Sequence, residues 1–222
     1  MADTTSIVLV NPPICEGSYR HQPYMPIGLA YLAAVLEKAG HQVKVLDCAA
    51  LSMSFQELKT RIVQFKPDIV GVTAMTPTVG SALKVASLVK EVSPSTLVVF
   101  GGVHPTFMDK EMLREVDHVD VIIRGEGEHT IIDLVSALEE RRGLKGVLGI
   151  TYREEGSIYR NPERPYIENL DDLPKPGFRH FPLEKYRVFG RKILPVVSSR
   201  GCPFQCSFCV TSRVFGRKVR MR

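Results

Sequence analysis

The sequence contains no tryptophan, and aromatic residues make up only 8% of its 222 positions. No apolar run approaches the roughly 18–20 residues of a membrane-spanning helix, and the first residues lack the positive charge of a secretory signal. Five cysteines do not make an even disulfide set, and three of them lie within eight residues. We therefore expect a cytoplasmic protein without an integral membrane segment, whose clustered cysteines bind metal or carry out redox chemistry.

The remaining composition is that of a globular chain, with 44% hydrophobic and 24% charged residues. Its charge is unevenly distributed: residues 1–182 have a net charge of −4, and residues 183–222 have a net charge of +9. A basic chain can indicate a nucleic-acid partner. The arginine-rich stretch from Arg213 to Arg222 has only Phe215 to stack on bases, so we expect no nucleic-acid partner.

Five short apolar runs indicate buried strands, and the segments between and after them have helical periodicity. The strands are Ser6–Val10, Gln42–Asp47, Asp68–Thr73, Leu97–Phe100 and Val119–Arg124, and the helices are Pro26–Ala39, Ser54–Phe65, Thr76–Val92, Asp109–Glu115 and Thr130–Arg142. This alternation predicts an α/β fold with a doubly wound five-stranded parallel sheet, flavodoxin-like or Rossmann-like. Ligands of such sheets bind outside the carboxyl ends of the strands.

Two helix starts carry local signals. Ser54 and Glu57 have the spacing of a capping box, and Thr76 followed by Pro77 predicts an N-cap with proline in the first turn.

The pattern changes after residue 145. The runs Val147–Arg153 and Ser157–Arg160 predict a β-hairpin, the proline-rich stretch from Glu163 to Pro182 predicts a surface linker, and Ile193–Ser198 predicts another strand. We therefore divide the chain into an α/β domain (1–145), a hairpin and linker (146–190) and the beginning of a second domain (191–222).

The cysteines at positions 202, 206 and 209 form a CxxxCxxC motif directly after that last strand. Structural zinc and ferredoxin-like clusters normally take four protein ligands. Three thiolates without a fourth ligand in the loop favour an iron–sulfur cluster with one open site. Two alternatives stay open: a zinc site completed by a distant residue such as His180, or three ordinary thiols.

This motif resembles that of the radical S-adenosylmethionine enzymes, in which CxxxCxxC follows the first strand of a partial (β/α) barrel. The resemblance implies that Cys202, Cys206 and Cys209 ligate a 4Fe-4S cluster and that S-adenosylmethionine binds its open iron. Phe208 takes the place of the family's aromatic residue before the third cysteine, although it is equally compatible with a core position. The family also implies a small-molecule substrate and an external electron donor of the flavodoxin or ferredoxin type.

The preceding domain resembles the cobalamin-binding domain of cobalamin-dependent members, and is closest in look to the anaerobic magnesium-protoporphyrin monomethyl ester cyclase-like group. Four segments carry the resemblance: Asn11-Pro12-Pro13, Thr73–Pro77, Gly101–Thr106 and Gly125–Glu128. The residues it implies for cofactor binding are Asn11, Pro12, Thr73, Thr76, Gly101, Gly102, His104, Thr106, Gly125, Glu126 and Gly127. Glycines would admit the backbone close to the ring and threonine hydroxyls would bond its polar groups, whereas Glu126 and Glu128 suit helix capping or amide contacts.

The cobalt ligand is left open. Many cobalamin domains carry an Asp-x-His-x-x-Gly loop after the first strand, and the loop at residues 14–25 contains His21 without that spacing. His21, His104 or no residue could ligate cobalt, and a histidine in the turn at 104 is more often a structural hydrogen-bonding group.

The resemblance predicts a cobalamin-binding fragment of an enzyme that methylates or oxidatively cyclises an unactivated carbon. Because most of the barrel would lie beyond residue 222, we expect no turnover from this chain alone. We expect its basic residues to pack against further barrel elements or against their carboxylates. The alternative is a non-enzymatic flavodoxin-like module that binds a nucleotide or flavin and holds structural zinc.

Overall fold

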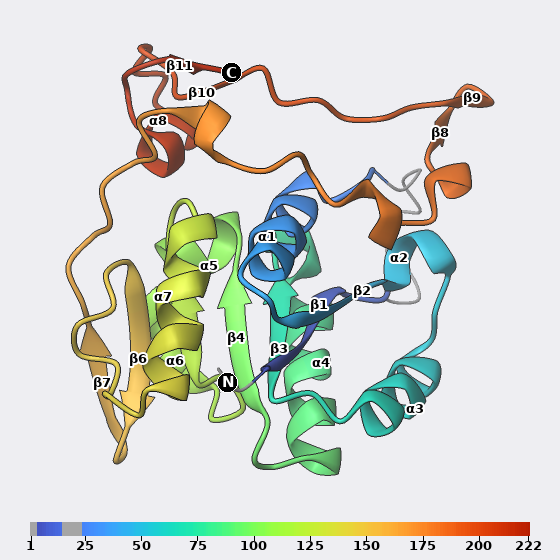
Figure 1. Ribbon diagram of the computed structural model, residues 1–222, viewed down its shortest axis with the longest axis vertical. Coiled ribbons are helices and arrows are strands. Elements are labelled where there is room, and N and C mark those ends of the chain that lie inside the picture. The colour runs from blue at the N-terminus through green and yellow to red at the C-terminus, as the bar shows by residue number, and fades with distance from the viewer. Residues whose placement is uncertain (1–3, 15–23) are drawn as a thin grey trace.

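The computed structural model describes residues 4–14 and 24–222, and Figure 1 shows a central sheet with the C-terminal chain passing over one of its ends. The sheet has the strand order β2-β1-β3-β4-β5-β6-β7. Five strands are parallel: β1 (Ser6–Asn11), β2 (Gln42–Asp47), β3 (Ile69–Thr73), β4 (Leu97–Gly101) and β5 (Val121–Ile123). The predicted five-stranded parallel sheet is therefore confirmed.

Helices cover both faces of the sheet because its strands are apolar on both faces. Ile7 and Leu9 pack into one core with α1 (Ile27–Lys38) and α7 (Glu128–Glu139), which lie in front of the sheet in Figure 1. Val8 and Val10 point to the other face and its second core. The helices there are α3 (Phe55–Phe65), α4 (Val79–Val92) and α6 (Asp109–Glu115).

Of the two helix starts predicted from local signals, at Ser54 and at Thr76, the structure confirms the first and differs at the second. Ser54 and Glu57 form the predicted capping box, with Glu57 N donating to Ser54 Oγ at 3.2 Å and Ser54 N donating to Glu57 Oε2 at 2.7 Å. Thr76 is not the N-cap of the next helix, because a 3-10 turn, η1 (Thr76–Thr78), precedes α4. The Thr78 hydroxyl accepts from Met75 N at 3.0 Å and closes this turn.

Two short helices of the α/β domain were not predicted. α2 (Cys48–Leu51) follows β2 directly, because Asp47 accepts from Ala50 N at 3.1 Å and acts as its N-cap. α5 (Val103–Phe107) forms where the sequence predicts a loop after β4.

The hairpin of β6 (Ile150–Glu154) and β7 (Ser157–Arg160) extends the parallel sheet as two antiparallel strands. Buried polar contacts hold it there. Arg124, at the end of β5, donates to Thr151 and to the carbonyl of Asn161. Asp109 accepts from Thr151 at 2.5 Å and from Arg160 at 2.8 Å.

Residues 161–186, which we call the strap, cross the outer face of α1 in Figure 1 and contain η2 (Leu170–Asp172), η3 (Phe178–His180) and η4 (Leu183–Lys185). The segment predicted as a surface linker lies over α1, and five apolar side chains of the strap are buried in the core beneath it: Ile167, Leu170, Leu173, Phe181 and Tyr186. Gly177 N donates to Ala30 O of α1 at 2.9 Å. Each fully buried side chain of this size contributes about 1.5–3 kcal/mol, so the strap is part of the folded unit.

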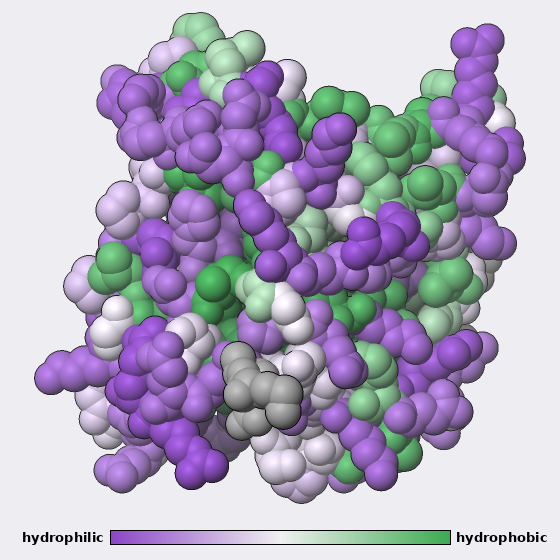
Figure 2. Space-filling model, in the orientation of Figure 1, coloured by the Kyte–Doolittle hydropathy of each residue, from purple (hydrophilic) through white to green (hydrophobic). Residues whose placement is uncertain are grey.

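The chain then forms the hairpin of β8 (Arg187–Val188) and β9 (Arg191–Lys192) and runs back to β10 (Ser199–Arg200), α8 (Thr211–Phe215) and β11 (Arg220–Met221). The strand predicted at residues 193–198 is not formed: among the described residues, these positions belong to none of the sheets. Instead β10 pairs with β11. Figure 2 shows hydrophobic surface along this returning segment, in which Leu194 and Val196 are exposed. Among the described residues, no helix is both long and apolar enough to cross a membrane.

Candidate functional site

The loops after β3 and β4 come together at the carboxyl edge of the parallel sheet. Thr73 and Gly101 are paired in register at the ends of their strands. Ala74 N donates to Gly101 O at 2.9 Å, and the Thr76 hydroxyl lies 3.1 Å from Nδ1 of His104. His104 is therefore a hydrogen-bonding partner of the neighbouring loop, as expected for a structural histidine.

Gly102 is exposed at this edge and can only be glycine. Its φ is +101°, and a Cβ atom would lie 2.7 Å from the carbonyl oxygen of Ala74 and 3.1 Å from the hydroxyl of Thr73. Gly101 has no such restriction, since a Cβ there would first meet Ile123 O at 3.8 Å. The close approach at Gly102 thus joins two loops of the protein.

Thr106 connects the loop after β5 to this pair. Its hydroxyl donates to Gly102 O at 2.8 Å and accepts from Gly125 N at 3.1 Å. Gly127, two residues on, packs against α1, where a Cβ would lie 3.3 Å from the side chain of Leu32. The segments after β3, β4 and β5 therefore form one continuous edge.

Large apolar side chains are exposed along the loops of this edge. Met75 after β3 is 57% exposed, and the stretch after β4 exposes Val103, Phe107 and Met108. Exposed apolar side chains gathered at the carboxyl edge of a parallel sheet are typical of a ligand-binding surface.

Asn11 and Pro12 lie at the carboxyl end of β1, between the ends of β2 and β3. Asn11 Nδ2 donates to Oδ1 of Asp47 at 2.8 Å, and Pro12 is buried. The hydroxyl of Tyr186 donates to the second oxygen of Asp47 at 2.6 Å, and burial together with this bond raises the pKa of Tyr186. These residues tie the strap to β1 and β2. His21 lies outside the described residues.

Glu126 and Glu128 are buried and paired with arginines of the C-terminal segment. Oε1 of Glu126 accepts from Arg200 at 2.9 Å, and Oε2 accepts from Arg220 at 2.8 Å and from Ile167 N at 2.9 Å. Burial alone would raise the pKa of Glu126, but the bonds from Arg220 and Arg200 hold it below its usual value. Sequence reasoning missed these pairs, and the only signal was the concentration of arginines near the cysteines.

The basic segment is thus partly neutralised by carboxylates of the α/β domain. Arg200 also donates to Oε1 of Glu128 at 2.5 Å. The basic residues were expected to pack against further barrel elements or their carboxylates, whereas Arg200 and Arg220 pair with carboxylates of the α/β domain.

The three clustered cysteines lie on an accessible loop (residues 201–210, the cysteine loop) between β10 and α8. Cys206 is exposed, and Cys202 and Cys209 are half-buried. Hydrogen bonding to Thr211 lowers the pKa of the Cys209 thiol. Within the described part of the chain, no group of three His, Cys, Asp or Glu side chains is arranged to hold a metal ion. The structure therefore supplies three soft thiol donors on one loop without a preformed ligand geometry.

Two alternatives from the sequence, a core position for Phe208 and a zinc site completed by His180, do not fit the structure. Phe208 is 88% exposed, so it is not a core residue. His180 Nε2 lies 2.9 Å from Oε1 of Glu37, which also pairs with Arg179 at 2.6 Å, and it does not complete a zinc site with the cysteines.

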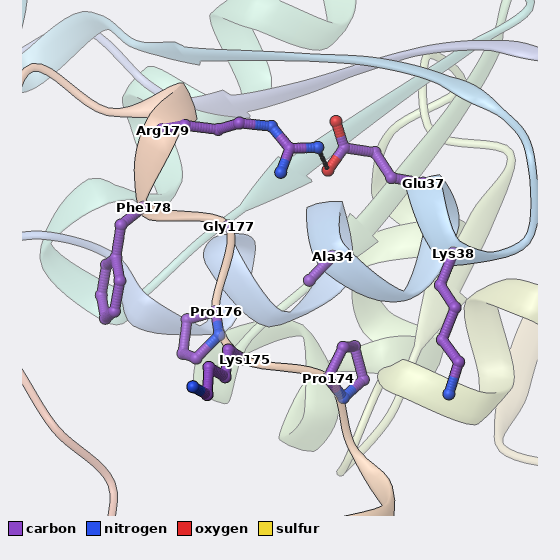
Figure 3. Close-up of a pocket in the computed structure, with 9 residues that line it drawn as sticks. All are labelled: Ala34, Glu37, Lys38, Pro174, Lys175, Pro176, Gly177, Phe178 and Arg179. Atoms are coloured by element: carbon purple, nitrogen blue, oxygen red, sulfur yellow. Dashed lines mark ion pairs between the residues drawn. The ribbon is translucent and has the colours of Figure 1, made fainter.

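The ion pair of Arg179 with Glu37 borders a hollow of about 470 Å³ between α1 and residues 174–179 of the strap (Figure 3). This hollow lies against the outer face of α1, away from the sheet edge.

Known proteins similar to this chain include both the α/β domain with its sheet edge and the cysteine loop. A family model described as the B12 binding domain matches residues 18–135. The chain is 42% identical over 195 residues to an uncharacterized methyltransferase of Pyrococcus horikoshii, a match that covers 88% of this chain and 42% of that protein. It is 36% identical over 203 residues to the anaerobic magnesium-protoporphyrin IX monomethyl ester cyclase of Rubrivivax gelatinosus, covering 89% of this chain and 36% of the cyclase. The chain thus spans about two fifths of the length of these relatives.

Two solved structures share the fold. The cobalamin-dependent S-adenosylmethionine radical enzyme OxsB, with aqua-cobalamin and S-adenosylmethionine bound, superposes with a TM-score of 0.83 at 21% identity, covering 99% of this chain and 30% of OxsB. The radical S-adenosylmethionine methyltransferase TsrM of Kitasatospora setae, with cobalamin and an iron–sulfur cluster bound, gives 0.74 at 21% identity, covering 99% of this chain and 44% of TsrM. The likeness extends through the strap and the cysteine loop.

Proposed function

Because the chain belongs to the B12-binding domain family, we propose that it binds cobalamin at the carboxyl edge of its parallel sheet. The observation that carries this proposal is the exposed position of Gly102, flanked by the exposed side chains of Met75 and Val103. A broad, largely apolar ring needs such an open apolar contact surface.

The residues of the edge have two proposed roles. Thr73, Thr76, Gly101, Gly102 and His104 would contact the cofactor, because they lie on the loops after β3 and β4. A second set would hold these loops in place: Asn11, Pro12, Thr106, Gly125, Glu126 and Gly127. No cobalt ligand is assigned, since the hydrogen bond of His104 to Thr76 gives that histidine another role.

We further propose that Cys202, Cys206 and Cys209 hold a 4Fe-4S cluster and that Phe208 packs beside it. Three thiolates on one accessible loop suit such a cluster with an open iron, where S-adenosylmethionine would bind. When bound, this group supplies one-electron chemistry for radical generation. The chain's own part is to present three thiols together, one of them with a lowered pKa that favours the thiolate.

The whole protein is proposed to be a radical S-adenosylmethionine enzyme that methylates or oxidatively cyclises an unactivated carbon of a small molecule. The names of the relatives, a methyltransferase and a cyclase, support both reactions equally. An external donor of the flavodoxin or ferredoxin type would reduce the cluster, and exposure of Cys206 supports access to it. Free thiols at all four described cysteines support a reducing compartment such as the cytoplasm.

An absorbance titration of the chain with hydroxocobalamin tests the first proposal. We expect saturable binding in the micromolar range, with no comparable binding of flavin mononucleotide. Tight flavin binding without cobalamin binding would contradict the proposal.

Anaerobic reconstitution with iron and sulfide tests the second. The wild-type chain is expected to take up four irons per chain, and Cys206→Ala is expected to lose most of them, whereas Cys48→Ala serves as the control. Stoichiometric zinc in place of iron, or equal iron in all three proteins, would contradict the cluster.

A further inference from the structure

The cysteine loop is closed at its base by two arginines that face each other. Arg200 directly precedes Gly201 and Cys202, and Arg220 lies opposite it in the antiparallel pair of β10 and β11. Like charges directly opposite each other on paired strands repel. Both arginines are nevertheless buried, with relative exposures of 9% and 4%.

One carboxylate bridges both of them, and a second completes the charge balance. Glu126 uses Oε1 for Arg200 at 2.9 Å and Oε2 for Arg220 at 2.8 Å. The second nitrogen of the Arg200 fork donates to Glu128 at 2.5 Å. We call these four residues the clamp. A lysine would not match Arg200, because its donors all lie on one nitrogen, whereas the planar fork reaches Glu126 and Glu128 from two separate nitrogens.

Aromatic rings surround the clamp. The Arg200 guanidinium lies 5.2 Å from the ring centre of Tyr31 on α1, and Arg220 lies 5.2 Å from that of Tyr166 in the strap. Gly216 permits this packing, since a Cβ there would lie 2.7 Å from the Tyr166 ring. These contacts are cation–π interactions that also exclude water from the charges.

The clamp is joined to the sheet edge through a short chain of contacts. Glu126 follows Gly125, whose N–H donates to Thr106, and Thr106 donates to Gly102 at the proposed cofactor surface. At its other end, Arg200 is two residues from Cys202. A continuous series of hydrogen bonds and chain neighbours therefore leads from the sheet edge through the buried clamp to the first cysteine.

We propose that Glu126 and Glu128 are positioning residues that fix the cysteine loop relative to the carboxyl edge of the sheet. That this positioning holds the proposed cluster near the proposed cobalamin site rests on the proposed function. The positioning of the cysteine loop by the clamp does not. Removing one partner leaves the arginines buried without full compensation, so the β10–β11 pair should open while the sheet stays folded.

Amide hydrogen exchange of the whole 222-residue chain tests this proposal. Glu126→Gln keeps the size of the side chain and removes its charge. The matched control is Glu168→Gln, which removes an exposed partner of Lys218 in the same segment. We expect at least tenfold faster exchange in Glu126→Gln at the N–H groups of Cys202 and Arg222, which donate to Gly216 and Ser198, with unchanged exchange in β1, β3 and β4.

Unchanged exchange at these amides in Glu126→Gln would overturn the proposal. Faster exchange throughout the chain would also overturn it, because the glutamate would then serve general stability. Equal effects of Glu126→Gln and Glu168→Gln would show that any charge loss loosens the segment.

Arg200→Lys provides the second variant, which retains the charge and lacks the fork. We expect the same local acceleration of exchange, at least threefold, with hydroxocobalamin binding as in the wild type. Wild-type exchange in this variant would contradict the bridging role of the arginine. If the wild-type chain does not bind hydroxocobalamin, the proposed function fails, and the exchange data still decide on the clamp.

Discussion

Substituting Gly102 by alanine should damage both the fold and the cofactor site, and the structure allows the two effects to be separated. A non-glycine residue at positive φ costs about 1–2 kcal/mol. The new Cβ would also lie 2.7 Å from Ala74 O, which accepts from His104 N at 3.3 Å. The loops must move apart, and loss of that hydrogen bond adds about 0.5–1.5 kcal/mol. We therefore expect Gly102→Ala to lower the free energy of unfolding by about 1.5–3.5 kcal/mol.

Gly156→Ala is the matched control for this substitution. Gly156 also has a positive φ, +77°, but it lies in the turn between β6 and β7 with no atom within 4 Å of a built Cβ. Urea unfolding should show a loss of only about 1–2 kcal/mol. Hydroxocobalamin titration should show at least tenfold weaker binding for Gly102→Ala and unchanged binding for Gly156→Ala. Equal stability losses and unchanged cobalamin binding in both variants would refute the assignment of Gly102 to the edge.

Three further outcomes follow from buried groups. Tyr186→Phe removes a bond to Asp47 and should cost about 1.5–3 kcal/mol in urea unfolding, whereas Tyr159→Phe, at an exposed position, should cost almost nothing. The pKa of Glu126 is lowered from 4.5, so its contribution to stability is complete above about pH 4.5 and is lost as the pH falls through the lower folded-state value. The stability of Glu126→Gln should therefore depend less steeply on pH in acid unfolding. An acid profile identical to that of the wild type would contradict this. Burial raises the pKa of Cys48 to about 12, so iodoacetamide at pH 8 should label the thiols of the cysteine loop and spare Cys48 in mass spectra of the native protein; prompt labelling of Cys48 would contradict its burial.

Much of the α/β domain was predictable because its signals are local. Apolar runs located the five parallel strands, and the pair Ser54 and Glu57 located the start of α3. The exact start of α4 was not predictable, because Thr76 and Thr78 both have hydroxyls that can close a turn before the helix. In the structure Thr78 accepts from Met75 N, and α4 begins after it.

The strap and the clamp depend on partners distant in the sequence. Tyr186 meets Asp47 across 139 positions, and Arg220 meets Glu126 across 94. The buried positions of the strap have no helical or strand period, so its prolines suggested a surface linker. Clustered thiols and the glycines of the sheet edge were visible in the sequence, whereas the burial of Glu126 between two arginines required the fold.

The most direct test of the central claim is a crystal structure of this chain grown with hydroxocobalamin. We expect the corrin against the carboxyl edge of β3 and β4, in contact with the backbone of Gly102 and with Met75 or Val103. Cobalamin bound elsewhere, such as in the hollow between α1 and the strap, or its absence at saturating concentration, would contradict the proposed cobalamin site.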